Sequence, residues 1–227
     1  MRIATRYLLR PMRLEDISQV MEIERESFPA MWPPTAFKRE LQQNRLARYI
    51  VVTEHNPSPA VAEEAPEPAP RGGTLGRIFE EIRHILGGDE SGQGLPPPDQ
   101  RHELIIGCAG VWLLPDEAHI VTVAVRQSRR RRGIGELLLI SAIELAQNGG
   151  QPLVTLECRV SNEPALAMYE KYSFQQVGRR PRYYSDNHED AYILTANSVS
   201  SRRYLATFGQ LKAAHRRRWG DFETAGY

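Results

Sequence analysis

The sequence predicts an α/β fold, and three observations predict it. Short β-like runs alternate along the chain with segments whose apolar residues recur at helical spacing. Two of the runs, 103–114 and 118–125, are joined by the turn Pro-Asp-Glu-Ala and are typical of a β-hairpin. A glycine-bearing loop then leads into a leucine-rich helical segment over 135–150. Strands and helices that alternate in this way are typical of α/β domains.

The remaining elements follow from the same two periodicities. Before residue 54 we expect a strand over 6–12, a helix over 14–28, a proline-stiffened loop over 28–34, a helix over 35–44 and a strand over 48–53. After residue 150 we expect a strand over 153–160, a helix over 161–174, a strand pair over 175–184 and 190–196, and a basic amphipathic helix over 202–219. Thr35 is expected to be the N-cap of the second helix, and Asn44 to lie near its end.

Residues 54–102 differ in composition from the rest of the chain. They hold eight of the 16 prolines and one aromatic residue, Phe79. Such a segment buries too little apolar surface to offset its ordering entropy, so most of it is expected to be disordered. Within it, the helical spacing of the apolar residues over 75–86 predicts a short amphipathic helix that docks on its own domain, on a partner or on a membrane. We therefore expect one domain over 1–196, interrupted by this insert, and a basic extension over 197–227.

Composition excludes several classes of protein. The formal net charge is +1, so the chain as a whole does not seek polyanions, and no direct nucleic-acid function is expected. Cys108 and Cys158 stand in apolar runs, which argues for a reducing compartment and against a disulfide framework. No cluster of His, Cys and Asp has metal-ligand spacing, so we expect no metal. The sequence contains neither a signal-like apolar region nor a membrane-length apolar stretch, which predicts a soluble, cytoplasmic protein.

The stretch "RRRRGIGELLL" (129–139) predicts an anion site. A helix that follows a glycine-bearing loop presents free backbone N–H groups at its positive end, and this arrangement suits a pyrophosphate. Gly133 and Gly135 lack Cβ atoms, so an anion can approach the backbone closely. The stretch has neither the third glycine of a dinucleotide fold nor the Gly-Lys-Ser/Thr of a P-loop. The alternative interpretation of four arginines is a solvated basic face.

These residues resemble the Gcn5-related N-acetyltransferase (GNAT) superfamily. Residues 130–135, "RRRGIG", match its Gln/Arg-x-x-Gly-x-Gly/Ala signature, and "LECRVSNEPALAMYEKYSF" is similar to its RimI branch. The resemblance covers 6–53 and 103–196. It implies a mixed, largely antiparallel sheet with helices on both faces. It also implies acetyl-CoA as co-substrate, held where strands 118–125 and 153–160 splay apart. The acceptor implied is the N-terminal alanine of a small-subunit ribosomal protein.

The resemblance also implies where the cofactor binds. Main-chain groups of the preceding strand would hold the pantetheine arm, the loop would hold the pyrophosphate, and an asparagine on the next helix would contact the cofactor. In this chain those residues are Val123, Ala124 and Val125 in the strand, Arg130, Arg131, Arg132, Gly133, Ile134, Gly135 and Glu136 in the loop, and Asn162. The alternative for Asn162 is the N-cap of its helix, and both roles are compatible.

Two residues are candidates for the chemistry by the same resemblance. Glu157 is the candidate general base, because it stands in a strand that otherwise reads as core, where an unused carboxylate is costly. Its alternative is a salt bridge to Arg159 or to another arginine. Tyr169 is the candidate general acid for the departing thiolate, and its alternative is a core aromatic beside Tyr172. Attack by the amine is expected to be direct, without an acetyl-cysteine intermediate.

The energetics of proton removal favour an α-amine as acceptor. With a pKa of about 7.7–8.0, an α-amino group costs about 1.4 kcal/mol to deprotonate at pH 7, whereas a lysine costs about 4.6 kcal/mol. A lysine, another N-terminus or a small-molecule amine stays as an alternative acceptor. A catalytically inactive module that binds RNA or the ribosome through the basic tail is a more distant alternative.

Two loops are expected to hold the acceptor. By resemblance they carry Phe28, Pro29, Trp32, Tyr183 and Tyr184, although aromatic residues in such loops could equally fill the core. His119 and His188 are expected to have no catalytic part.

Overall fold

The computed structural model describes residues 6–28, 33–55 and 103–225. The chain divides into two units, one formed by 1–55 with 103–227 and the other by 56–102. The second unit, with the helix expected over 75–86, lies outside the described residues, and so do Pro29 and Trp32. Every described helix and strand belongs to the first unit.

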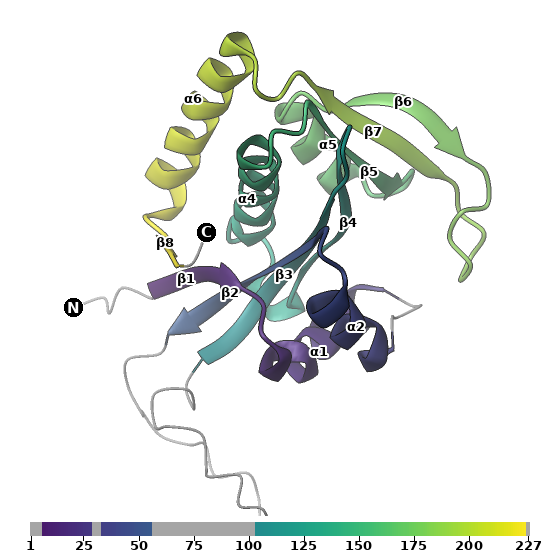
Figure 1. Ribbon diagram of the computed structural model, residues 1–227, viewed down its shortest axis with the longest axis vertical. Helices are drawn as coiled ribbons and strands as arrows, with labels where there is room; N and C mark the ends of the chain where they lie inside the picture. Colours follow the sequence, from purple (N-terminus) through teal and green to yellow (C-terminus); the bar gives the residue numbers. More distant parts are fainter. Residues whose placement is uncertain (1–5, 29–32, 56–102, 226–227) are drawn as a thin grey trace, which may run out of the picture. The chain divides into compact units, whose positions relative to one another are not determined.

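The first unit alternates strands and helices nearly as the sequence predicts (Figure 1). Its strands are β1 (Arg6–Pro11), β2 (Ala47–His55), β3 (Glu103–Leu113), β4 (Ala118–Val125), β5 (Leu153–Arg159), β6 (Gln175–Arg180), β7 (Ala191–Asn197) and β8 (Glu223–Thr224). Its α-helices are α1 (Ile17–Ser27), α2 (Pro34–Gln43), α4 (Ile134–Asn148), α5 (Glu163–Lys171) and α6 (Arg202–Trp219). Two 3-10 turns, η1 (Leu14–Asp16) and η3 (Gln127–Arg129), precede α1 and α4.

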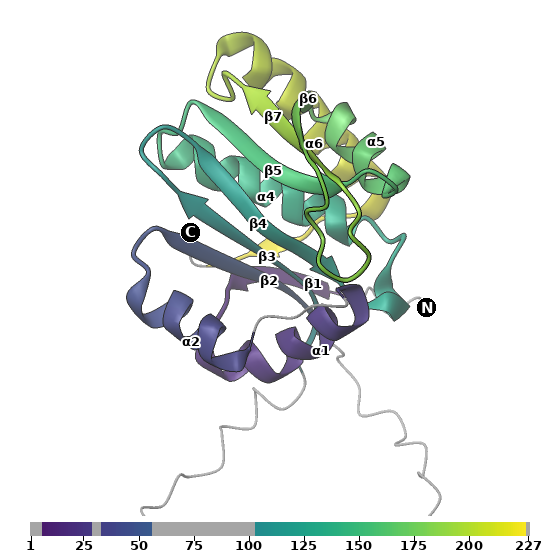
Figure 2. The same cartoon turned by 90° about the vertical axis from the view of Figure 1, so that its right-hand side faces the viewer.

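The strands form one mixed sheet in the order β6-β7-β5-β4-β3-β2-β1-β8. All neighbours are antiparallel except β4 with β5 and β1 with β8, which are parallel. Helices α4 and α6 cover one face, and α1 and α2 cover the other (Figures 1 and 2). The predicted mixed, largely antiparallel sheet with helices on both faces is confirmed.

The parallel strands β4 and β5 separate after a short contact. Ala118–Ile120 pair with Val154–Leu156, and no pairing between the described residues of the two strands continues beyond them. On its other side β4 stays paired with β3 as far as Val125, and a bulge between Gly110 and Val111 adds twist to that pair. Within the described sheet, the edge of β4 that faces β5 therefore lacks a partner strand beyond Ile120. The splayed strands expected from the sequence are confirmed.

Two local expectations need correction. The N-cap of α2 is Pro33 rather than Thr35, because Pro34 occupies the first helical position, where a missing N–H costs nothing. The short strand β8 was not expected, and it pairs in parallel with Leu8 and Leu9 of β1. A two-residue strand has no periodicity of its own, so only its partner defines it. Asn44 is the C-cap of α2, as expected.

The C-terminal segment packs tightly against α4 and α5. Tyr204 Oη donates to the carbonyl of Tyr172 at 3.1 Å, Phe208 is buried, and Lys212 pairs with Glu144. Among the described residues, both cysteines are free and buried, and no helix has the length and apolarity needed to cross a membrane.

Candidate functional site

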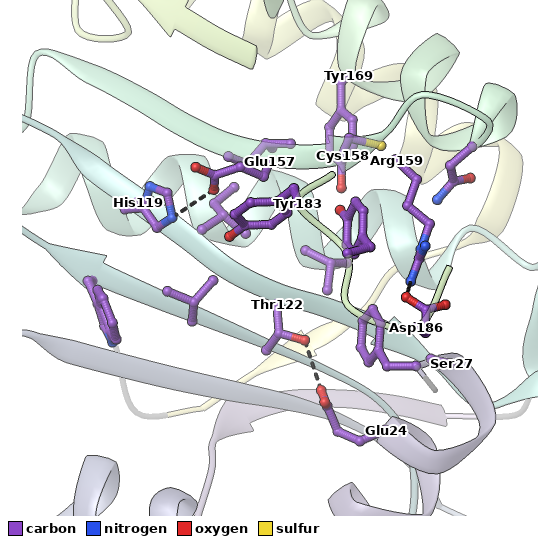
Figure 3. A pocket seen from close by; sticks show the side chains of 18 of the residues that line it. Glu24, Ser27, His119, Thr122, Glu157, Cys158, Arg159, Tyr169, Tyr183 and Asp186 are labelled. Carbon is purple, nitrogen blue, oxygen red and sulfur yellow. Dashed lines mark hydrogen bonds and ion pairs between the residues drawn. The ribbon is translucent and has the colours of Figure 1, made fainter. Parts of the chain in front are cut away.

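A cavity of about 560 Å³ lies where β4 and β5 splay apart. Its walls come from these two strands, from α1 and α5, and from the segment that joins β6 to β7. Both candidate catalytic residues, Glu157 and Tyr169, line it (Figure 3), and Asn162 also belongs to its lining. The fold therefore gathers residues from distant parts of the chain around one pocket.

Glu157 is held between a histidine and an arginine. Arg180 Nε donates to Glu157 Oε1 at 2.9 Å, and His119 Nε2 lies 3.1 Å from Glu157 Oε2. The salt bridge that was the alternative role of Glu157 is thus present, but its partner is Arg180 and not Arg159. Arg159 lies instead at 2.8 Å from Asp186 and 3.2 Å from Glu189.

These contacts fix the charge of Glu157. The hydrogen bond from His119 is the largest influence, and together with Arg180 it outweighs burial and lowers the pKa of Glu157. The carboxylate is therefore ionised at every pH where an amine begins to lose its proton. A low pKa makes Glu157 a weak resting base, but a strong attractor for positive charge that develops on an attacking nitrogen.

Replacing Arg180 with alanine is expected to move the acid limb of kcat to higher pH. Arg180 helps to lower the pKa of Glu157, so without it the carboxylate is protonated sooner as the solution is acidified. The shift is expected to be small, because the Arg180 side chain is 53% exposed and solvent screens its charge. The measurement is kcat against pH at saturating substrate.

Arg179→Ala is the matched control, because Arg179 pairs with Asp190 at 2.6 Å rather than with Glu157. An acid limb that does not move in the Arg180 variant, or moves equally in the control, would contradict this expectation.

His119 adds a second polar side chain to the pocket. An ionised carboxylate only accepts hydrogen bonds, so His119 Nε2 is the donor in this contact. The sequence predicts no catalytic part for His119, whereas the structure sets it beside Glu157 (Figure 3). The available signal was alternation along β4, which places this imidazole on the same face as Val121.

Tyr169 of α5 is buried in the wall of the pocket, and its hydroxyl points into the pocket (Figure 3). Its ring packs against Phe174, with the centroids 5.6 Å apart. Burial raises the pKa of Tyr169, so the phenol keeps its proton. No hydrogen bond to this hydroxyl is present in the part of the chain that the structure describes, which leaves it able to donate to a ligand. The ring is thus a core aromatic, and the hydroxyl remains available.

The loop before α4 has the geometry of an anion site. Gly133 caps the helix in the left-handed conformation, with φ +77°, and Arg131 is also left-handed, with φ +62°. A left-handed arginine costs about 1–2 kcal/mol, so the loop holds a strained backbone. A Cβ added to Gly135 would meet only a methyl of Val125 at 3.7 Å, so the backbone there is open to a ligand. The main chain of this loop fits a pyrophosphate.

The side chains of the loop are used differently. Arg130 donates to the carbonyls of Val125 and Glu26 and to Ser27 Oγ, each at 3.2 Å, so it fastens the loop to α1. Glu136 accepts from Lys171 at 2.5 Å and from the Tyr172 hydroxyl at 2.7 Å. The main-chain N–H of Arg130 donates to the carbonyl of Gln127 at 3.3 Å, so of these two residues only Glu136 keeps a main-chain N–H for a phosphate within the described parts of the chain. Arg131 and Arg132 are exposed.

The remaining cofactor candidates lie on the walls of the splay. Val123, Ala124 and Val125 form the end of β4, where the edge toward β5 has no partner strand in the described sheet. Asn162 caps α5, and its side chain accepts from the N–H of Ala165 at 3.4 Å. The N-cap role of Asn162 is thus present, and its position in the pocket wall leaves a cofactor contact open.

The acceptor candidates that can be described all line the same pocket. These are Phe28, Tyr183 and Tyr184. Arg159 lies 3.8 Å above the ring of Tyr184, which rigidifies the segment between β6 and β7. The Tyr183 side chain is exposed, so it is available to a ligand rather than to the core.

A buried acidic residue was missed from the sequence. Glu24 of α1 lies in the pocket wall, accepts from Thr122 Oγ1 at 2.8 Å, and is buried (Figure 3). Burial raises the pKa of Glu24, although the bond from Thr122 opposes it. The sequence did contain a signal for the burial of Glu24, because this residue occupies a position of the apolar helical stripe formed by Ile17, Val20 and Met21. Among the described residues, no three His, Cys, Asp or Glu side chains are grouped to hold a metal ion.

Comparison with known proteins agrees with this geometry. The model of the acetyltransferase (GNAT) family matches residues 89–174. A Bacillus subtilis (strain 168) protein whose assigned name is ribosomal protein bS18-alanine N-acetyltransferase is 32% identical over 190 residues, covering 84% of this chain and 95% of its own. An N-alpha-acetyltransferase of Saccharolobus solfataricus is 28% identical over 192 residues, covering 83% and 91%. The crystal structure of Arabidopsis thaliana NAA60 with acetyl-CoA shares the fold, with a TM-score of 0.58, 18% identity and coverage of 84% and 98%.

Proposed function

Since the chain belongs to the acetyltransferase (GNAT) family and is an acetyl-CoA-dependent acyltransferase, we propose that it acetylates the N-terminal α-amine of a protein. The acceptor we propose is the N-terminal alanine of a small-subunit ribosomal protein, as the name of the Bacillus subtilis relative states for that protein. Such an acceptor would place the reaction in the cytoplasm.

One observation carries the proposal. The pocket at the splay of β4 and β5 sets an ionised carboxylate, Glu157, and an available hydroxyl, Tyr169, in its walls. A family member needs a group that receives the proton of the amine and a group that stabilises the departing thiolate. The loop before α4 follows directly on β4, whose residues line this pocket, and its open backbone at Gly135 is consistent with a pyrophosphate there.

Each residue of the pocket has its own part in the proposed reaction. Acetyl-CoA, when bound, supplies a thioester carbonyl for direct attack by the amine. Glu157 stabilises the positive charge that grows on the nitrogen as its bond to the carbonyl carbon forms. The proton then leaves the nitrogen for the Glu157 carboxylate, directly or by a water, and passes from there to solvent. As the C–S bond breaks, Tyr169 donates its hydrogen bond to the sulfur, and the thiolate takes its proton from the phenol or from solvent.

The acceptor is tested by measuring coenzyme A release with three peptides. One begins with a free alanine, one is its N-blocked copy that carries a lysine, and one begins with methionine followed by an acidic residue. We expect turnover of the free-alanine peptide, and kcat/KM at least about tenfold lower for the other two. That difference corresponds to about 1.4 kcal/mol of transition-state stabilisation. Preference for the blocked lysine peptide would overturn the α-amine proposal and leave the fold intact.

A further inference from the structure

The end of α6 lies directly on the anion-binding loop. The indole of Trp219 packs so closely that a Cβ added to Gly133 would lie 2.6 Å from its Cδ1 atom. His215 is buried one turn earlier, and its Nε2 lies 3.0 Å from the carbonyl of Gly133. A carbonyl only accepts, so Nε2 is the donor. Two side chains of the C-terminal helix therefore contact the residue that caps α4.

This contact is fixed from both sides. Before it, Phe208 of α6 is buried against Tyr172. After it, Phe222 stacks on Tyr7 with the centroids 5.5 Å apart, and β8 pairs with β1. Trp219 is thus held between two anchored segments, and the chain cannot withdraw it without breaking one of them.

The same contact brings unpaired positive charge to the loop. Arg216, Arg217 and Arg218 are exposed, and within the described ranges none of them has an acidic partner. Arg218 lies 4.9 Å above the Trp219 ring. Arg131 and Arg132 of the loop are likewise exposed and without an ion pair among the residues described. Because His215 and Trp219 share the face of α6 that contacts Gly133, Arg216 and Arg218 flank that face, whereas Arg217 lies on the opposite side of the helix.

Helix dipoles explain only part of this arrangement. Cations stabilise the C-terminus of a helix by about 0.3–1 kcal/mol each, so Arg216–Arg218 suit the end of α6. The same rule disfavours Arg131 and Arg132 at the N-terminus of α4. An anion with more than one phosphate group would neutralise both sets. A pyrophosphate would neutralise the arginines of the loop. The arginines at the end of α6 would then neutralise a further phosphate group, which carries a charge of about −1.5 to −2 if it is a monoester.

We propose that the last turn of α6 is part of the acetyl-CoA site, where Arg216 and Arg218, which flank the face of α6 that contacts Gly133, bind the 3′-phosphate of the nucleotide and Trp219 holds the helix against the loop. This inference rests on the proposed function, because it requires the pyrophosphate of coenzyme A in the loop. It gives the C-terminal segment a role in holding the nucleotide rather than in binding the ribosome or RNA.

The test compares coenzyme A with dephospho-coenzyme A, which lacks the 3′-phosphate, by calorimetric titration of the full chain. We expect wild type to bind coenzyme A about tenfold more tightly, equivalent to about 1.4 kcal/mol. Arg216→Gln with Arg218→Gln is expected to remove this preference, because coenzyme A affinity falls while dephospho-coenzyme A affinity changes less than about twofold. The matched control is Arg202→Gln with Arg203→Gln, the same charge change about 22 Å away along α6 at 1.5 Å per residue. The control is expected to keep the preference.

Three results would overturn the inference. The first is a variant at Arg216 and Arg218 that keeps the preference. The second is a wild type that binds both ligands equally, which would leave the proposed function standing. The third is a Trp219→Ala variant that binds both ligands more tightly, because the indole would then obstruct the loop. If wild type binds neither ligand, the proposed function fails as well. Helicity of each variant by circular dichroism shows whether α6 is intact.

Discussion

Glu157→Gln is expected to lower kcat by about 10² to 10⁴, the usual contribution of a positioned acid–base group. Glutamine keeps the shape of the side chain, so Arg180 and His119 retain a neighbour, but the negative charge is lost. The amine then develops positive charge during attack with no carboxylate beside it. The KM for acetyl-CoA is expected to change little, because the loop before α4 is untouched. Steady-state coenzyme A release at fixed peptide measures both constants.

The pH dependence separates a catalytic from a structural role of Glu157. Between pH 7 and pH 9 the free fraction of an α-amine with pKa about 7.7–8.0 rises by up to about tenfold. If Glu157 serves proton removal, the ratio of wild-type to Glu157→Gln activity narrows over this range. A ratio that stays constant with pH would indicate that glutamine only disturbs the pocket. Glu170→Gln is the control, since this exposed carboxylate of α5 does not line the pocket.

Much of the fold could be predicted because its information is local. The ends of the period-2 runs and helical stripes fall within four residues of the ends of the observed strands and helices, and the glycine loop lies where a strand is followed by a helix. Resemblance to the family singled out Glu157, Tyr169 and Asn162, and the pocket brings all three together. Whether each carries out the role predicted for it stays a prediction.

The partners of these residues could not be predicted, because they depend on register and packing. His119 meets Glu157 only because β4 and β5 pair in parallel with His119 opposite Thr155, and no local pattern sets that register. Arg180 reaches Glu157 across β7, which lies between their strands in the sheet. Likewise, the apolar stripe of α6 predicts a helix but not the groove into which it packs. The arrival of Trp219 at Gly133 follows from that packing and from β8.

Tyr169→Phe is expected to lower kcat by about 10² and to leave stability nearly unchanged. The substitution keeps the ring that packs on Phe174 and removes only the hydroxyl, which makes no hydrogen bond within the described parts of the chain. Loss of one preorganised donor to a developing anion costs about 10² to 10³ in kcat. Coenzyme A release gives kcat, and thermal unfolding gives the free energy of unfolding.

Tyr172→Phe provides the matched comparison on the same segment. The Tyr172 hydroxyl donates to Glu136 at 2.7 Å, so its removal is expected to cost about 1–3 kcal/mol of stability with little effect on kcat. The two variants should therefore separate, one lowering kcat and the other lowering the melting temperature. If Tyr169→Phe instead lowers the melting temperature and leaves kcat intact, Tyr169 is a core aromatic and no more. The departing thiolate would then take its hydrogen bond from water or from another group of the pocket.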